Sequence, residues 1–167
     1  MYLKLLLLSI FVTVSANLSI DLPQVRVAYR EASHNEGKVK QLHEDLISVA
    51  KTDNKILVAY KGAVITMMAK YATVMKVKKN LFKDGAELLE YAIELDSNNV
   101  EIRCIRLSVQ ENVPKITGYN KNIEEDKNFI LENFDAMDDE GAKNFVSGYA
   151  SESEVFNEAE KELLQAP

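Results

Sequence analysis

The chain of 167 residues contains a single cysteine, no tryptophan, three prolines and six glycines. Because one cysteine cannot form an intramolecular disulfide, packing alone must hold the fold together. Proline and glycine, the residues that most often interrupt helices, are scarce, whereas Leu, Ala, Glu and Lys are common. The composition therefore favours helices over strands.

The sequence also lacks an excess of positive charge, with 20 basic and 26 acidic side chains and a formal net charge of −6. This balance argues against a nucleic-acid partner, since the phosphate backbone requires a concentrated basic surface. By the same argument, binding to an anionic lipid surface is disfavoured. With 47% hydrophobic and 28% charged residues, the chain has the composition of a globular protein.

The N-terminal segment has the organisation of a secretory signal peptide. Lys4 precedes the apolar run Leu5–Val14, and small residues follow up to a cleavage site after Ala16. The run is too short to cross a bilayer, which takes roughly 20 residues. We therefore predict a cleaved signal peptide over residues 1–16, a single helical domain over 17–167 and no stable membrane insertion after cleavage. The expected location is the periplasm or the extracellular space.

Apolar residues recur at steps of three and four along most of the remaining chain. Three such stripes are Val39, Leu42, Leu46 and Val49; Ile56, Tyr60, Ala63, Met67 and Tyr71; and Leu81, Gly85, Leu88, Ala92 and Leu95. This spacing predicts an all-α fold of about six to eight helices, and short connections predict antiparallel helical hairpins. The best strand candidate is the short run Val74–Val77. Two S-x-x-E sequences, which begin at Ser33 and Ser151, predict helix N-terminal caps.

The segment 54–97 resembles a tetratricopeptide unit. In its second helix, Gly85, Leu89, Ala92 and Ser97 stand where the repeat usually has Ala, an aromatic residue, Ala and Pro. Glycines at 62 and 85 lie in apolar faces, which indicates a closely packed neighbouring helix. The connector 72–80 is longer than the repeat allows, so the expected architecture is a degenerate tetratricopeptide-like array.

A wider resemblance covers the central part of the chain. The strings AYKGA (59–63), LLEYAIELDSNNVEIRCIRLSVQENVPK (88–115) and GYNKNIEEDK (118–127) resemble those of a group of short, exported, helical bacterial proteins that carry no established activity. The resemblance implies a location in the cell envelope and a helical fold, and it implies no reaction.

The most specific candidate site lies between Asn99 and Asp126. Arg103, Arg106 and Gln110 share one face of an otherwise apolar predicted helix, so the two guanidinium groups need partners. In one interpretation, Glu87, Glu90 or Glu94 of the preceding helix, or Asp126 of the following one, pairs with the arginines, while Asn112 and Tyr119 bond to loop backbone. In the other, the arginines line a polar pocket for a carboxylate, a peptide terminus or a phosphate. The candidate binding residues are Arg103, Arg106, Gln110, Asn112, Tyr119 and Asn122.

The sequence gives little support for a metal site, a cofactor site or a reactive thiol. His34 and His43 are nine residues apart and would lie on opposite sides of a continuous helix, so we predict no metal site. Gly-rich phosphate loops and G-x-S-x-G elbows are absent from the sequence, which predicts no cofactor. The apolar surroundings of Cys104 predict a buried, inert thiol.

No nucleophile, base and oxyanion donor can be named together, so the sequence predicts a protein that is not an enzyme. The leading hypothesis is an interaction module of the bacterial envelope that presents a helical-array surface to an unidentified protein or peptide. The alternatives are a small-ligand-binding or accessory enzyme subunit that uses the Arg/Gln/Tyr pocket, and a structural helper that stabilises a partner. Fold alone does not decide among them.

Overall fold

The computed structural model describes residues 21–166, and in this range it contains eight α-helices, two short 3₁₀-helices and no strand. The helices are α1 (Leu22–Ala32), α2 (Glu36–Asp45), α3 (Lys55–Tyr71), α4 (Met75–Leu95), α5 (Val100–Asn112), η1 (Lys115–Thr117), η2 (Tyr119–Asn122), α6 (Ile123–Asn133), α7 (Glu140–Glu152) and α8 (Glu158–Leu163). The predicted all-α fold class is thus confirmed for this part of the chain. The predicted signal peptide, cleavage site and first mature residues lie outside the described residues.

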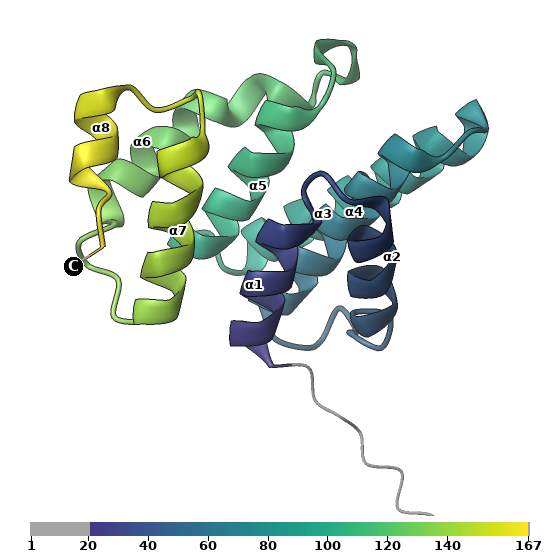
Figure 1. The fold of residues 1–167 in the computed structure, drawn as a ribbon, viewed down its shortest axis with the longest axis horizontal. Coiled ribbons are helices and arrows are strands. Elements are labelled where there is room, and N and C mark those ends of the chain that lie inside the picture. Colours follow the sequence, from purple (N-terminus) through teal and green to yellow (C-terminus); the bar gives the residue numbers. More distant parts are fainter. Residues whose placement is uncertain (1–20, 167) are drawn as a thin grey trace, which may run out of the picture.

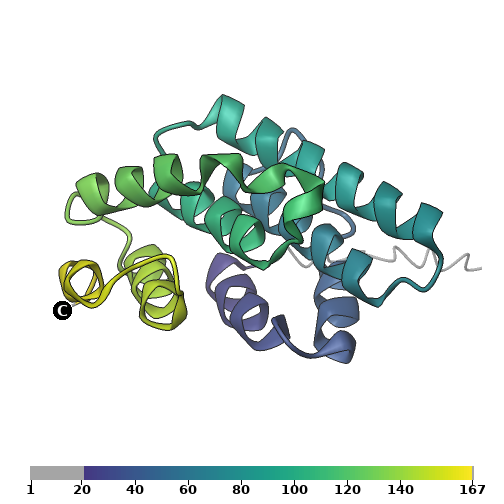
Figure 2. The same ribbon diagram turned by 90° about the horizontal axis from the view of Figure 1, so that it is seen from above.

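Helices that follow one another in the chain pack together, so the array is built from the pairs α1 with α2, α3 with α4, α5 with α6 and α7 with α8 (Figure 1). The longest hairpin is formed by α3 and α4, and its far end extends beyond the neighbouring helices in both views (Figures 1 and 2). No helix in the described range is long and apolar enough to cross a membrane.

Helix α5 is the centre of the array. It packs against α3, α4, α6 and α7, and all 11 residues from Val100 to Gln110 are buried. The buried apolar residues form one core that runs from Val25 in α1 to Leu164 after α8. Rings from three different helices meet within it, with centroid distances of 5.2 Å between Tyr29 and Tyr60 and 5.6 Å between Tyr60 and Phe145.

Helices α3 and α4 cross at their two glycines. A Cβ atom on Gly62 would lie 2.7 Å from the carbonyl oxygen of Gly85, and a Cβ atom on Gly85 would lie 2.5 Å from the carbonyl oxygen of Gly62. Real Cβ atoms do not approach other atoms so closely, which means that the two backbones touch here because neither residue has a side chain. The close packing predicted at these positions is confirmed.

Asparagine, not serine, starts the helices at the two positions where we expected S-x-x-E caps. Ser33 still has helical backbone angles at the end of α1, and Ser151 lies in the last turn of α7. The side chain of Asn35 accepts the Lys38 N–H at the start of α2, and Asn157 caps α8 in the same way. Asparagine is as good an N-cap as serine and stands closer to the helix start in both cases, so both serine predictions are wrong.

The strand candidate Val74–Val77 is wrong as well. Val74 is the N-cap of α4, and the next residues form its first turn. Two β-branched residues cannot specify a strand without a partner strand, and the lysines around them are good helix formers. The connector between α3 and α4 is therefore only residues 72–74, not 72–80.

The glycine contact predicts that Gly85→Ala lowers the free energy of unfolding by about 1–3 kcal/mol, because the new methyl group overpacks the crossing by more than helix propensity returns. Urea denaturation checks this. Gly37→Ala in α2 is the matched control, since a Cβ atom there meets nothing closer than 3.4 Å. Equal stability of the two variants would contradict the contact.

Candidate functional site

Helix α5 carries four of the six predicted site residues, namely Arg103, Arg106, Gln110 and Asn112. Its N-terminus is fixed by Asn99, whose side chain accepts the Ile102 N–H at 3.1 Å. Because the helix is buried, each charged group on it needs a partner from a neighbouring helix. Glu101 and Arg103 lie about 200° apart around the axis, so the partners come from two opposite sides.

On one side, two arginines share one buried carboxylate. Arg106 binds Asp126 with two hydrogen bonds, Nε to Oδ2 at 2.7 Å and Nη2 to Oδ1 at 2.6 Å. Arg103 donates from Nη1 to the same Oδ1 at 3.0 Å and to Oε1 of Glu125 at 2.6 Å. The Asp126 side chain is fully buried. The Asp126 cluster consists of these four residues together with Glu90, Tyr119 and Asn122, whose contacts follow.

Glu90, Tyr119 and Asn122 lie around the two arginines and their carboxylate partners. Glu90 of α4 accepts from Arg106 Nη1 at 3.0 Å and from the Tyr119 hydroxyl at 2.6 Å. Asn122 donates to Glu125 at 2.6 Å. The hydrogen bonds from Arg103 and Asn122 lower the pKa of Glu125, and burial together with Glu90 raises the pKa of Tyr119. Both shifts keep these groups in the protonation states that the cluster needs.

Four of the six candidate residues therefore belong to one network, namely Arg103, Arg106, Tyr119 and Asn122. Asn112 instead donates to the carbonyl oxygen of Ser108 at 2.9 Å, and neither amide atom of the buried Gln110 has a hydrogen-bond partner among the described residues. The arginines use Glu90 and Asp126, as the ion-pair interpretation expected, whereas Tyr119 bonds to Glu90 and not to loop backbone. The two guanidinium groups are occupied within the chain and line neither concave surface described below.

The opposite side of α5 holds a second ionic cluster that the sequence interpretation missed. Arg26 of α1 donates to both carboxylate oxygens of Glu101 at 2.8 Å and to Asp139 at 2.8 Å. The Tyr60 hydroxyl of α3 donates to Glu101 at 2.8 Å. We call these four residues the Glu101 cluster. The sequence showed only an acidic residue, Glu101, inside an apolar helix. Its partner Arg26 could not be identified, because the two residues are 75 positions apart.

The C-terminal end of α5 is tied to α7 by neutral donors. Glu111 accepts from the Tyr149 hydroxyl at 2.6 Å, from the Ser153 hydroxyl at 3.0 Å and from the Glu154 N–H at 2.8 Å. Polar contacts thus hold α5 along its whole length.

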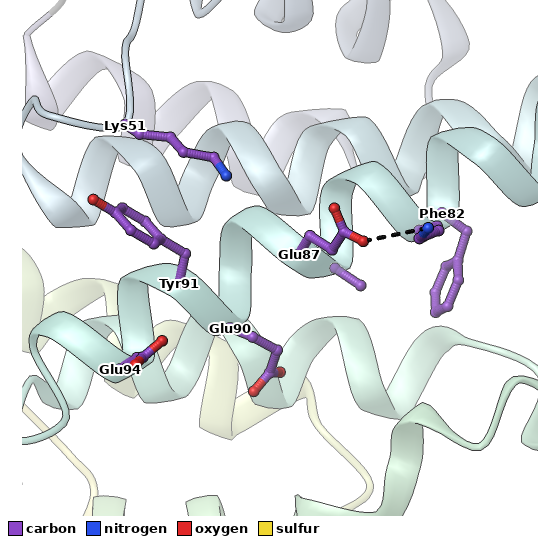
Figure 3. Close-up of a pocket in the computed structure, with 8 residues that line it drawn as sticks. Lys51, Phe82, Glu87, Glu90, Tyr91 and Glu94 are labelled. Atoms are coloured by element: carbon purple, nitrogen blue, oxygen red, sulfur yellow. Dashed lines mark ion pairs between the residues drawn. The ribbon is translucent and has the colours of Figure 1, made fainter.

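An open groove runs along α4, with a volume of about 540 Å³ (Figure 3). It is lined by Lys51, Phe82, Lys83, Ala86, Glu87, Glu90, Tyr91 and Glu94. The Tyr91 ring has two lysine nitrogens near its face, Lys51 Nζ at 5.2 Å and Lys55 Nζ at 5.5 Å from the centroid. Glu90 belongs both to the groove and to the Asp126 cluster, so the buried network reaches the surface here.

A smaller concavity of about 260 Å³ borders the Glu101 cluster, with Glu101 and Asp139 among its lining residues. Both carboxylates are bonded to Arg26, and this bond lowers the pKa of Asp139. Within residues 21–166, no group of three or more His, Cys, Asp or Glu side chains is placed to hold a metal ion.

No protein-family model, curated protein or solved structure matches this chain.

The Asp126 cluster predicts that Asp126→Asn lowers the free energy of unfolding by about 3–5 kcal/mol, because it leaves two buried guanidinium groups without a full counter-charge. Urea denaturation followed by circular dichroism measures the loss. Glu125→Gln is the matched control. The Glu125 side chain is 55% exposed, so removing its charge should lower the free energy of unfolding by less than about 1 kcal/mol. Losses of equal size would show that Asp126 is not the anchor of the cluster.

Cys104 is fully buried, and burial raises the pKa of its thiol well above the usual value. We expect the native protein at pH 8 to resist a chromogenic disulfide reagent and to react with one equivalent once unfolded in urea, because the reactive thiolate forms only after exposure. Rapid labelling of the folded protein would refute the burial of this residue.

Proposed function

We propose that this protein is a non-enzymatic interaction module of the cell envelope that binds a segment of another protein, or a peptide, in the groove along α4. The observation that carries the proposal is the groove itself, which is wide open to solvent and combines aromatic side chains with charges of both signs. Enclosed sites suit small molecules, whereas a long open surface beside a helix suits an extended or helical segment.

The lining suggests the chemistry of the partner. Glu87, Glu90 and Glu94 follow one another at steps of three and four, so they share one face of α4. Glu87 and Glu94 are exposed, and Glu87 pairs with Lys83 at 3.6 Å (Figure 3), whereas Glu90 is held by Arg106 and Tyr119. A segment with one or two basic residues would meet the exposed glutamates, while its apolar side chains would lie against the aromatic groups.

Tyr91 and Phe82 are the aromatic anchors of the groove. Phe82 packs edge-on against the Tyr119 ring at 5.6 Å between centroids, and Tyr119 is bonded to Glu90. The groove wall is therefore held by the buried network behind it. A surface that is ordered before binding loses less side-chain freedom when a partner arrives.

The envelope location rests on the signal-peptide organisation of residues 1–16 and on the resemblance to exported helical proteins. The role as a binding module rests on the groove and on the internal use of the arginines, which leaves the small-ligand alternative without its guanidinium donors. Both parts are addressed by one experiment in whole cells.

A photo-crosslinking amino acid at Ala86, inside the groove, is expected to yield one defined adduct in the envelope fraction of cells that produce the protein. The same amino acid at Glu132, which is exposed on α6, is the control and is expected to yield none. Adducts of equal yield at both positions, or none at Ala86, would contradict the proposal.

Charge reversal in the same crosslinking experiment tests whether the exposed glutamates of the groove bind the partner. With Glu87→Lys and Glu94→Lys together, the adduct from Ala86 should fall roughly tenfold, the effect of two rim ion pairs of about 0.7 kcal/mol each. Glu124→Lys with Glu132→Lys makes the same change in net charge on α6 and should leave the adduct unchanged.

A further inference from the structure

The end of the α3–α4 hairpin carries a concentration of charge opposite to that of the whole molecule. From Lys70 to Lys83 the sequence reads KYATVMKVKKNLFK, with five lysines and no acidic residue, in a chain whose net charge is −6. Lys83 is paired with Glu87 at 3.6 Å. The other four lysines form no salt bridge with the residues that the structure describes. Positive charge is therefore segregated to this end of the hairpin.

Apolar side chains stand exposed among these lysines. Val74 is 58% exposed, Met75 is 63% exposed and Val77 is 47% exposed. They occupy the N-cap and first turn of α4, at the end of the hairpin that extends beyond the other helices (Figures 1 and 2). We call the segment Lys70–Lys79 the hairpin tip. The tip projects from the rest of the array, and its exposed apolar residues lie close in sequence to four lysines (Figures 1 and 2).

We propose that the hairpin tip docks reversibly on an anionic phospholipid surface. The lysines match the negative headgroups in charge, while Val74, Met75 and Val77 enter the boundary between headgroups and acyl chains. Lysine stems lie along apolar surface and keep their charged ends in water, so the two kinds of contact form together. A projecting tip fits a deformable lipid interface, whereas a protein partner would need a matching cavity.

This proposal differs from the expectation, drawn from net charge, that binding to an anionic lipid surface is disfavoured. Electrostatic attraction acts over about 10 Å at ordinary salt concentration, so the local charge of the tip decides the contact and the distant acidic residues contribute little. The tip and the groove along α4 involve different residues, and the inference does not depend on the proposed function.

The test is co-sedimentation of the protein, purified from its producing cells, with two kinds of vesicle. One contains equal parts of phosphatidylglycerol and phosphatidylcholine, and the other contains phosphatidylcholine alone. We expect binding to the anionic vesicles only, and loss of that binding in high salt. Equal binding to both vesicles, or to neither, would overturn the proposal.

Two variants separate the tip from the rest of the surface. Lys76→Gln with Lys79→Gln should weaken binding to the anionic vesicles roughly 30-fold, the loss expected for two lysines at such a surface. Lys38→Gln with Lys40→Gln removes the same charge from α2, where both lysines are exposed and paired with glutamates, and should change binding less than about twofold. Equal losses would overturn the assignment of the tip.

A third variant tests the apolar contact. Met75→Ser with Val77→Ser keeps every charge and should weaken binding to the anionic vesicles roughly tenfold. Unchanged binding would contradict insertion of the tip. Sedimentation equilibrium without vesicles provides the remaining check, because self-association that disappears in the Lys76→Gln/Lys79→Gln variant would assign the tip to a second copy of this chain instead of lipid.

Discussion

The structure depends on one constraint, which is that its central helix is buried on every side and still carries charged residues. Helix α5 has no solvent-exposed face from Val100 to Gln110, yet it holds Glu101, Arg103 and Arg106. Glu101 pairs with Arg26 of α1, whereas Arg103 and Arg106 share Asp126 of α6, and the two clusters lie on opposite sides of the axis. A rotation of α5 by one residue would move these groups by about 100° into apolar surroundings, which is strongly unfavourable. The ion pairs therefore select one arrangement of α1, α3, α4, α6 and α7 around α5, even though the net stabilisation from buried pairs is small.

The same constraint shapes the surface. Because Arg103 and Arg106 are occupied by Asp126, the polar residues that looked suited to a ligand are part of the scaffold. The scaffold reaches the surface through Glu90, which is shared between Arg106 and the groove along α4. The buried charges and the half-buried aromatic side chains of the groove are thus connected, and the inner network orders the groove wall. The hairpin tip lies outside this network, and its exposed apolar residues Val74, Met75 and Val77 leave a surface free for a partner.

Features that depend on local periodicity could be predicted from the sequence. The stripes along α3 and α4 set the fold class, the apolar character of α5 indicated its burial, and the glycines at 62 and 85 indicated the close crossing. Glu90 and Asp126 could be named as partners of the arginines, because they belong to helices adjacent in sequence. Arg26 and Glu101 could not be paired, since only the packing of α1 against the array brings them together. The caps of α2 and α8 were assigned to the wrong residues because serine and asparagine are equally good caps. Ser33 lies two residues before Asn35, and Ser151 lies six residues before Asn157. The basic hairpin tip could not be recognised from the net charge, because a sum over the chain carries no information on where the charges lie.

A double-mutant cycle between Arg26 and Glu101 tests the central constraint most directly. The free energy of unfolding is measured for the wild type, for Arg26→Met, for Glu101→Gln and for the double variant. If the pair specifies how α1 packs on α5, the two substitutions will be coupled by about 2 kcal/mol or more, and the double variant will be more stable than the sum of the single losses implies. Losses that add within about 0.5 kcal/mol would mean that the two groups do not act on each other, and the account of α5 as the ionic centre of the fold would be wrong.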